Sequence, residues 1–129
     1  MRVLNAFAHG VLDYVVVVVL LLAPTLFHFT WLPALVAYLL AAVHLAVSLC
    51  TRYRLGVFRR IPFGAHGLLE AVVSVALVAL PWVAGFADQT VARSFYVAFG
   101  ILLFVVWLIT DYAGRVAHAA HAGPPAAGR

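Results

Sequence analysis

The sequence predicts an all-α membrane protein, a four-transmembrane-helix bundle made of two parallel two-helix repeats. The first observation is composition: of 129 residues, 67% are hydrophobic and 9% are charged. This leaves too little polar surface to cover a water-soluble globule of this size. The second is a series of apolar runs, each close to the roughly 20 residues that a membrane-spanning helix needs. The third is an internal duplication.

The duplication is clearest where a histidine and a carboxylate lie one helical turn apart. Ala8-His9-Gly10-Val11-Leu12-Asp13 returns as Ala65-His66-Gly67-Leu68-Leu69-Glu70, an offset of 57 positions (66 − 9 = 57). The same offset relates Arg2 to Arg59, Pro24 to Pro81 and Phe29 to Phe86. Near the end of each repeat the offset becomes 59 (110 − 51 = 59), which matches Thr51-Arg52-Tyr53 with Thr110-Asp111-Tyr112.

We therefore divide the chain into a first two-helix repeat (1–56), a second two-helix repeat (57–114) and a flexible cytoplasmic tail (115–129). The tail contains small and helix-breaking residues without an amphipathic stripe. We expect its histidines, His118 and His121, to be solvated rather than to bind a ligand.

Four spans are expected, and short connectors make neighbouring spans antiparallel. The first runs from Val3 to about Ala23 and is ended by Pro24, because proline disrupts a helix. The second covers residues 31–50. The third opens at Pro62 and is ended by Pro81 and Trp82, and the fourth covers about 91–112.

Charge predicts the orientation of these spans. All 8 basic residues are arginines, and four of them lie between the second and third spans: Arg52, Arg54, Arg59 and Arg60. Short loops rich in arginine are retained on the cytoplasmic side, so both termini are expected in the cytoplasm of a multi-pass inner-membrane protein. The same placement argues against a nucleic-acid partner, which needs a basic soluble surface. The expected partner is the lipid bilayer, and a second copy or another membrane protein stays open.

Five ionisable residues are expected to form one polar cluster within the bundle. At about 1.5 Å of rise per residue, His9, His44 and His66 fall within one turn of the same depth, and Asp13 and Glu70 lie one turn deeper. A charged side chain inside a bilayer costs about 2.5 to 3.5 kcal/mol on insertion scales. The five groups therefore need ion pairing, a bound cation, a cofactor or water to offset this cost. Imidazoles with carboxylates suit zinc or iron, and the five are candidate metal ligands.

Other uses of the same residues stay open. Each histidine can pair with the carboxylate one turn along, which would leave a structural or partner-binding protein with no cofactor. His9 and His66 can instead be axial haem ligands, with Gly10 and Gly67 leaving room for the macrocycle. Those glycines also suit close helix contacts. A proton relay is weakly supported, and no catalytic motif is present, so enzyme activity is left open.

Several segments resemble a family of small bacterial integral membrane proteins built from SPW repeats, named for a Ser-Pro-Trp that ends the spans. The resemblance covers about residues 5–112 and rests on His9-Gly10-Val11-Leu12-Asp13-Tyr14, Thr51-x-Tyr53-x-x-Gly56, Ile61-Pro62 and Pro81-Trp82-Val83-x-Gly85-Phe86. The chain departs from it where Leu80 replaces the serine, where Ala23-Pro24-Thr25 lacks the tryptophan, and at Glu70, often an aspartate. The resemblance implies a four-helix membrane protein and assigns no residue a role.

The predicted topology can be checked by cysteine labelling. The only native cysteine is Cys50, so the test uses a Cys50→Ser background that carries Arg54→Cys. Because Arg54 is expected on the cytoplasmic side, an impermeant maleimide should label it only after the cells are permeabilised. Labelling of intact cells from outside would contradict the topology.

Overall fold

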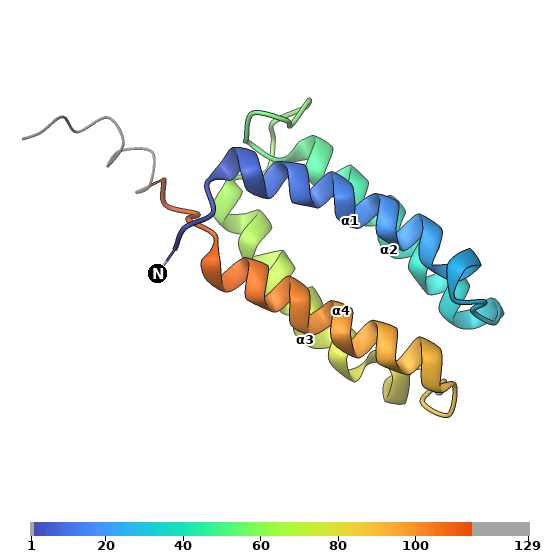
Figure 1. Cartoon of the computed structure of the whole chain (residues 1–129). Helices are drawn as coiled ribbons and strands as arrows, with labels where there is room; N and C mark the ends of the chain where they lie inside the picture. Colours follow the sequence, from blue (N-terminus) through green and yellow to red (C-terminus); the bar gives the residue numbers. More distant parts are fainter. Residues whose placement is uncertain (1, 115–129) are drawn as a thin grey trace, which may run out of the picture.

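The computed structural model describes residues 2–114, and four long helices account for most of them (Figure 1). They are α1 (Ala6–Leu26), α2 (Trp31–Cys50), α3 (Phe63–Val83) and α4 (Thr90–Ile109). Each has 20 or 21 residues and is long and apolar enough to cross a membrane. At about 1.5 Å per residue, such helices match the roughly 30 Å hydrocarbon core of a bilayer. The predicted all-α, four-transmembrane-helix fold is confirmed.

The two interior prolines do not end their helices, so this part of the prediction is wrong. α1 continues past Pro24 to Leu26, and α3 continues past Pro81 to Val83. Both prolines lie in the last turn, where the missing N–H removes only one helical hydrogen bond and little helix remains to be bent. The fourth span also ends earlier than predicted, at Ile109 rather than Tyr112.

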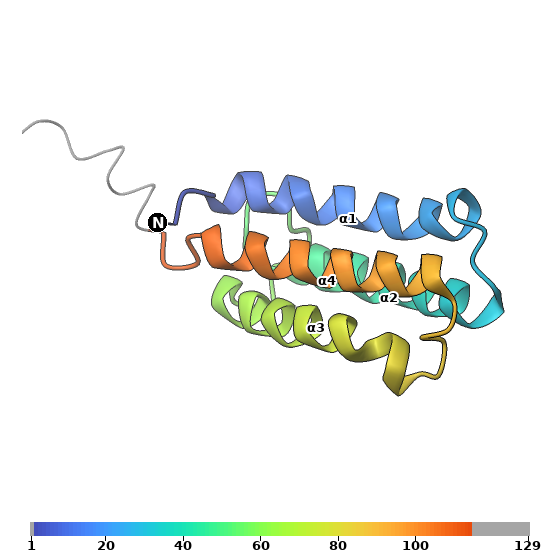
Figure 2. The ribbon, with the colours of Figure 1, turned by 60° about the horizontal axis from the view of Figure 1, so that its bottom comes forward.

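Helix packing is closest within each hairpin, between α1 and α2 and between α3 and α4. Figure 1 shows the hairpins as two layers that approach each other at the end carrying residues 51–62. In Figure 2 all four helices run along one common direction. Gly100 permits the close α3–α4 contact, because a Cβ at this position would lie 2.7 Å from the backbone oxygen of Ser74.

At the opposite end, polar contacts and aromatic rings connect the two hairpins. The Tyr96 hydroxyl donates to the backbone oxygen of Pro33 at 2.6 Å. The Thr30 hydroxyl donates to Gln89 Oε1 at 2.6 Å, which joins the two tight turns. The fully buried Phe86 and Tyr96 pack with the apolar core of the bundle. This end is therefore held by an apolar core together with two polar contacts between the hairpins.

The outward surface of the helices is apolar. Large hydrophobic side chains are exposed along each of them, including Val15 on α1, Leu39 on α2, Val72 on α3 and Leu102 on α4. Such a surface is unfavourable in water and favourable against lipid tails. The expected contact with a lipid bilayer is supported.

Matched contacts close the end that carries residues 51–62. Val3 N and Leu4 N both donate to the backbone oxygen of Ile109, at 2.8 and 3.0 Å. The matched residues make the same contacts: Arg60 N and Ile61 N, 57 positions after Val3 and Leu4, donate to the oxygen of Cys50, at 2.7 and 2.8 Å. Cys50 lies 59 positions before Ile109. These contacts follow the offsets of the sequence duplication, while the two parallel repeats and their division at residues 56 and 57 stay a prediction. The tail, with His118 and His121, lies outside the described residues.

The close contact at Gly100 gives a test of the packing. Gly100→Ala should destabilise the protein by about 1 to 3 kcal/mol, because the new methyl group forces α3 and α4 apart. The matched control is Gly64→Ala on α3, where an added Cβ would have no neighbour within 4 Å. Both variants are compared by thermal unfolding in the same detergent. Equal stabilities would contradict the packing described here.

Candidate functional site

The two repeated histidines are each oriented by a threonine at a helix end. His9 Nδ1 lies 3.0 Å from Thr110 Oγ1, and His66 Nδ1 lies 2.8 Å from Thr51 Oγ1. Each threonine follows the last residue of a helix in the opposite repeat, so the contacts cross between hairpins. Both histidines and both threonines are almost completely buried.

The threonines determine which ring nitrogen carries the proton. Thr51 Oγ1 also lies 2.7 Å from the oxygen of Val47, and Thr110 Oγ1 lies 2.7 Å from the oxygen of Val106. A carbonyl oxygen can only accept, so each hydroxyl donates its single hydrogen there and must accept from the histidine. Nδ1 of His9 and of His66 is therefore protonated. In a neutral ring, Nε2 then carries a lone pair.

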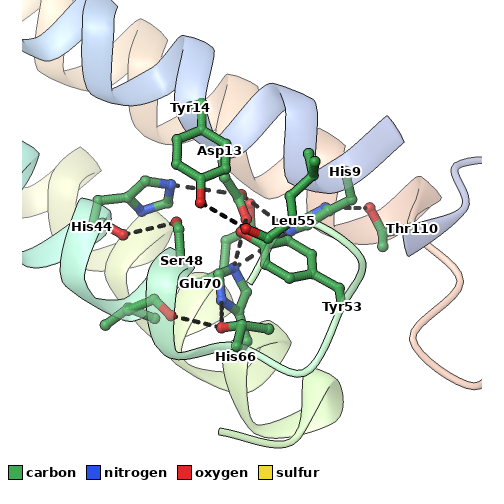
Figure 3. Close-up of polar contacts among 12 residues, drawn as sticks. His9, Asp13, Tyr14, His44, Ser48, Tyr53, Leu55, His66, Glu70 and Thr110 are labelled. Atoms are coloured by element: carbon green, nitrogen blue, oxygen red, sulfur yellow. Dashed lines mark hydrogen bonds and ion pairs between the residues drawn. The ribbon is translucent and has the colours of Figure 1, made fainter. Parts of the chain in front are cut away.

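These Nε2 atoms face each other between the two hairpins, near the end that carries residues 51–62, and lie 3.4 Å apart. Carboxylates lie on either side: His9 Nε2 is 3.3 Å from Asp13 Oδ1 and 3.6 Å from Glu70 Oε2 (Figure 3). His66 Nε2 is 3.6 Å from Asp13 Oδ2. The predicted local pairing is thus seen for His9 with Asp13, whereas His66 makes its ion-pair contact with Asp13 of the other repeat.

Two tyrosines complete the arrangement. Tyr53 donates to Asp13 Oδ2 at 2.8 Å, and Tyr112 donates to Glu70 Oε2. Burial and then the neighbouring carboxylate raise the pKa of each phenol, so both hydroxyls keep their hydrogen and act as donors. The acids therefore have hydrogen-bond partners as well as the histidines.

The repeated glycines make room for these tyrosines. A Cβ at Gly10 would lie 2.6 Å from Tyr53 Cε2, and a Cβ at Gly67 would lie 2.6 Å from Tyr112 Cε1. The rings thus occupy the space that sequence reasoning offered to a haem macrocycle. The glycines thus accommodate tyrosine rings from the segments after α2 and α4, rather than the close helix–helix contact that the sequence also suggested.

His44 occupies a different position from the other two histidines. Its Nε2 lies 3.6 Å from Asp13 Oδ1, is buried, and has no hydrogen-bond partner among the described residues. The residue 59 positions later is Leu103 (103 − 44 = 59), so His44 has no counterpart in the second repeat. Figure 3 shows it on the opposite side of Asp13 from His9.

The remaining polar residues near the cluster bond to their own helices. Ser48 donates to the oxygen of His44 at 2.8 Å, and Ser74 donates to the oxygen of Ala71 at 2.8 Å. Ser48 also contacts the Tyr53 hydroxyl, which bonds to Asp13, whereas the described contact of Ser74 stays within its own helix. A proton path through Ser74 gains no support from this arrangement.

Three of the five predicted ligands offer donor atoms that converge. One atom each from His9, His66 and Glu70 lies within 4.8 Å of the others, and all three residues are buried. Asp13 contacts both histidines, and His44 approaches through Asp13. The site can therefore hold a metal ion.

Sequence reasoning did not assign roles to Thr51, Thr110, Tyr53 and Tyr112. The signal that could have found them is the Thr-x-Tyr repeated at the offset of 59, which aligns the two repeats and contributes to the family resemblance. A threonine and a tyrosine at the end of each apolar run are uncharged. The cost of burying a charge, which pointed to the histidines and acids, therefore does not apply to them.

The chain matches no family model, no curated protein and no solved structure among those compared. The resemblance to SPW-repeat proteins therefore stays an expectation.

The hydrogen-bonding argument predicts one tautomer for both central histidines. In metal-free protein at neutral pH, nitrogen NMR of the histidine rings should show His9 and His66 protonated at Nδ1. Thr51→Val removes the acceptor for His66 and should cost about 1 to 3 kcal/mol of stability, because a buried N–H is left without a partner. The exposed His28 serves as an internal reference for the spectra. Protonation of either central ring at Nε2 alone would contradict the assignment.

Proposed function

We propose that the protein binds one divalent transition metal ion, zinc or ferrous iron, through His9 Nε2, His66 Nε2 and the Glu70 carboxylate. The observation that carries this proposal is the 3.4 Å approach of two nitrogen atoms whose lone pairs the threonines direct toward each other. Two neutral rings in this state cannot hydrogen-bond to each other. A cation between them would turn the repulsion into attraction.

The separations support an ion of this size. Ligands about 2.0 to 2.1 Å from a tetrahedral zinc ion lie about 3.3 Å from one another. His9 Nε2 is 3.4 Å from His66 Nε2 and 3.6 Å from Glu70 Oε2. Its distance to Asp13 Oδ1 is 3.3 Å. Small side-chain adjustments would suffice to close the site around an ion.

Charge also supports a divalent ion. With both acids ionised and the histidines neutral, Asp13 and Glu70 bring two negative charges into the apolar interior. A divalent cation would balance them. Two imidazoles with a carboxylate form the donor set of many non-haem iron sites and of some catalytic zinc sites, which keep one position open.

The surrounding residues would act by holding the ligands in place. Hydrogen bonding of a ligand's second ring nitrogen fixes its orientation and raises its basicity, which is the role proposed for Thr51 and Thr110. Asp13 would be a further ligand or a hydrogen-bond acceptor of the histidines. Direct binding by His44 stays a prediction.

The alternative is a cluster that only pairs internally, and the 3.3 Å contact of His9 with Asp13 favours it. This account requires a second proton on a histidine, so that Nε2 becomes a donor. It would leave a structural or partner-binding membrane protein. Bis-histidine haem binding has less support because tyrosine rings pack against Gly10 and Gly67.

The proposal also places the protein among SPW-repeat proteins in a bacterial inner membrane, with both termini cytoplasmic. The four spans and the arginines between α2 and α3 support the location. Assembly with a second copy or with another membrane protein stays open.

Elemental analysis tests the metal proposal directly. Protein purified in mild detergent without chelators should retain close to one zinc or iron per chain, with no Soret band in its absorption spectrum. His66→Ala should lower the metal content at least about tenfold, since removing one ligand costs more than the 1.4 kcal/mol that a factor of ten represents. His28→Ala, on an exposed turn, should leave it unchanged.

Other outcomes would lead to a different account. Metal content near zero in the wild type, after reloading with either ion has also been attempted, would favour the internally paired cluster. A Soret band would indicate haem. Unchanged metal in both His66→Ala and His9→Ala would place any bound ion elsewhere.

A further inference from the structure

A cavity of about 120 Å³ lies between the two hairpins and receives side chains from all four helices. Its walls are apolar, with Val16 and Leu20 from α1, Leu40 from α2, and Leu77 from α3 among the lining residues. An apolar cavity of about 150 Å³ in another protein binds benzene, so this space is near the size of one aromatic ring.

One end of the cavity is polar. His44, His66 and Glu70 line it there, and they belong to the polar cluster. The cavity therefore has the form expected for an amphiphilic ligand, with a long apolar wall and a small group of hydrogen-bonding side chains at one end.

The cavity also reaches the lipid-facing surface. Three of its lining residues are substantially exposed: Val43 on α2 at 61%, and Leu69 and Val73 on α3 at 48% and 37%. These side chains would face lipid tails in a membrane, so a molecule dissolved in the bilayer can enter between α2 and α3 without crossing water.

His44 supplies a polar group that the repeated contacts do not use. Its buried Nε2 has no hydrogen-bond partner among the described residues, and its matched residue, Leu103, lines the same cavity. Its 3.6 Å contact with Asp13 Oδ1 is longer than a hydrogen bond, so a hydroxyl group of a ligand could supply the missing partner.

The charges around the polar end of the cavity determine which polar group of a ligand can bind there. Glu70 lines the cavity and Asp13 lies 3.6 Å from His44 Nε2, so an anionic head would meet carboxylates. A charged amine could pair with Glu70, but its other N–H groups would lose their hydration among apolar walls without partners. A neutral hydroxyl can donate to an imidazole or a carboxylate and needs little space.

We infer that the cavity between the hairpins binds a lipid-soluble phenol, an aromatic ring with a hydroxyl group directed at His44 and Glu70 and an apolar tail directed into the bilayer. The inference goes beyond the proposed metal ion and does not require it. The two sites share His66 and Glu70, so a bound ion would lie at the polar end of the cavity.

The experiment measures binding of 4-pentylphenol to metal-free protein in nanodiscs by calorimetry, with empty nanodiscs subtracted. Saturable binding of one molecule per chain is expected. Pentylbenzene, which lacks the hydroxyl, should bind at least about tenfold more weakly, the factor that one hydrogen bond of about 1.4 kcal/mol represents. The anion 4-pentylbenzoate and the cation pentylamine should not compete.

Two pairs of variants locate the site. His44→Leu installs the residue found at the matched position and should reduce phenol affinity to that of pentylbenzene, with pentylbenzene affinity unchanged. Val16→Phe fills the cavity and should abolish binding of both compounds. Val15→Phe makes the same change at a neighbouring side chain that is 50% exposed, and should leave binding unchanged. Circular dichroism confirms that each variant is folded.

Any of three results would overturn the inference: no saturable binding to the wild type, equal binding of phenol and hydrocarbon, or unchanged phenol binding in folded His44→Leu protein. Zinc and iron content, measured on protein purified without chelators before the metal-free sample is prepared from it, keeps the two proposals separate. Phenol binding without retained metal would leave this inference standing while removing the metal proposal, and retained metal without phenol binding would do the reverse.

Discussion

The site depends on one constraint, which is that a hydroxyl has a single hydrogen to donate. Thr51 and Thr110 give theirs to the last turn of a helix. In a bilayer the helix end has few other donors for its free carbonyls, so this bond is strongly favoured. The histidines must therefore donate to the threonines, and their other nitrogens are left to face each other. The orientation of the two Nε2 atoms thus follows from the hydrogen bonds that Thr51 and Thr110 make at the ends of α2 and α4.

The same residues thus stabilise the fold and orient the site. The segments that follow α2 and α4 each carry a threonine, which contacts a histidine of the opposite hairpin, and then a tyrosine, which donates to the acid of its own hairpin. Because the threonine–histidine bonds and the His66–Asp13 contact cross between hairpins, the cluster also helps to hold together two units whose helices pack most closely within themselves. Loss of one polar contact is expected to affect both the packing of the hairpins and the geometry of the cluster.

Much of this could be predicted from sequence because hydrophobic length is a strong signal in membranes. It located all four helices, and the desolvation cost of Asp13 and Glu70 pointed to a shared cluster. The expectation that Pro24 and Pro81 end their helices was wrong, since a proline in the last turn breaks only one bond. Depth along a helix could not say which way His44 turns, and pairing within a repeat could not be told from pairing across repeats.

Backbone hydrogen bonds hold the first described residues against the last helix. Residues 3 and 4 join the end of α4 by the same backbone bonds that join residues 60 and 61 to the end of α2. The start of the described chain therefore lies beside its last helix just as its middle segment lies beside the second. A circular permutant, opened within residues 54–58 and joined from residue 114 to residue 2, would preserve every one of these bonds. The order of the two hairpins along the polypeptide is thus arbitrary for the architecture, and each could be supplied as a separate chain.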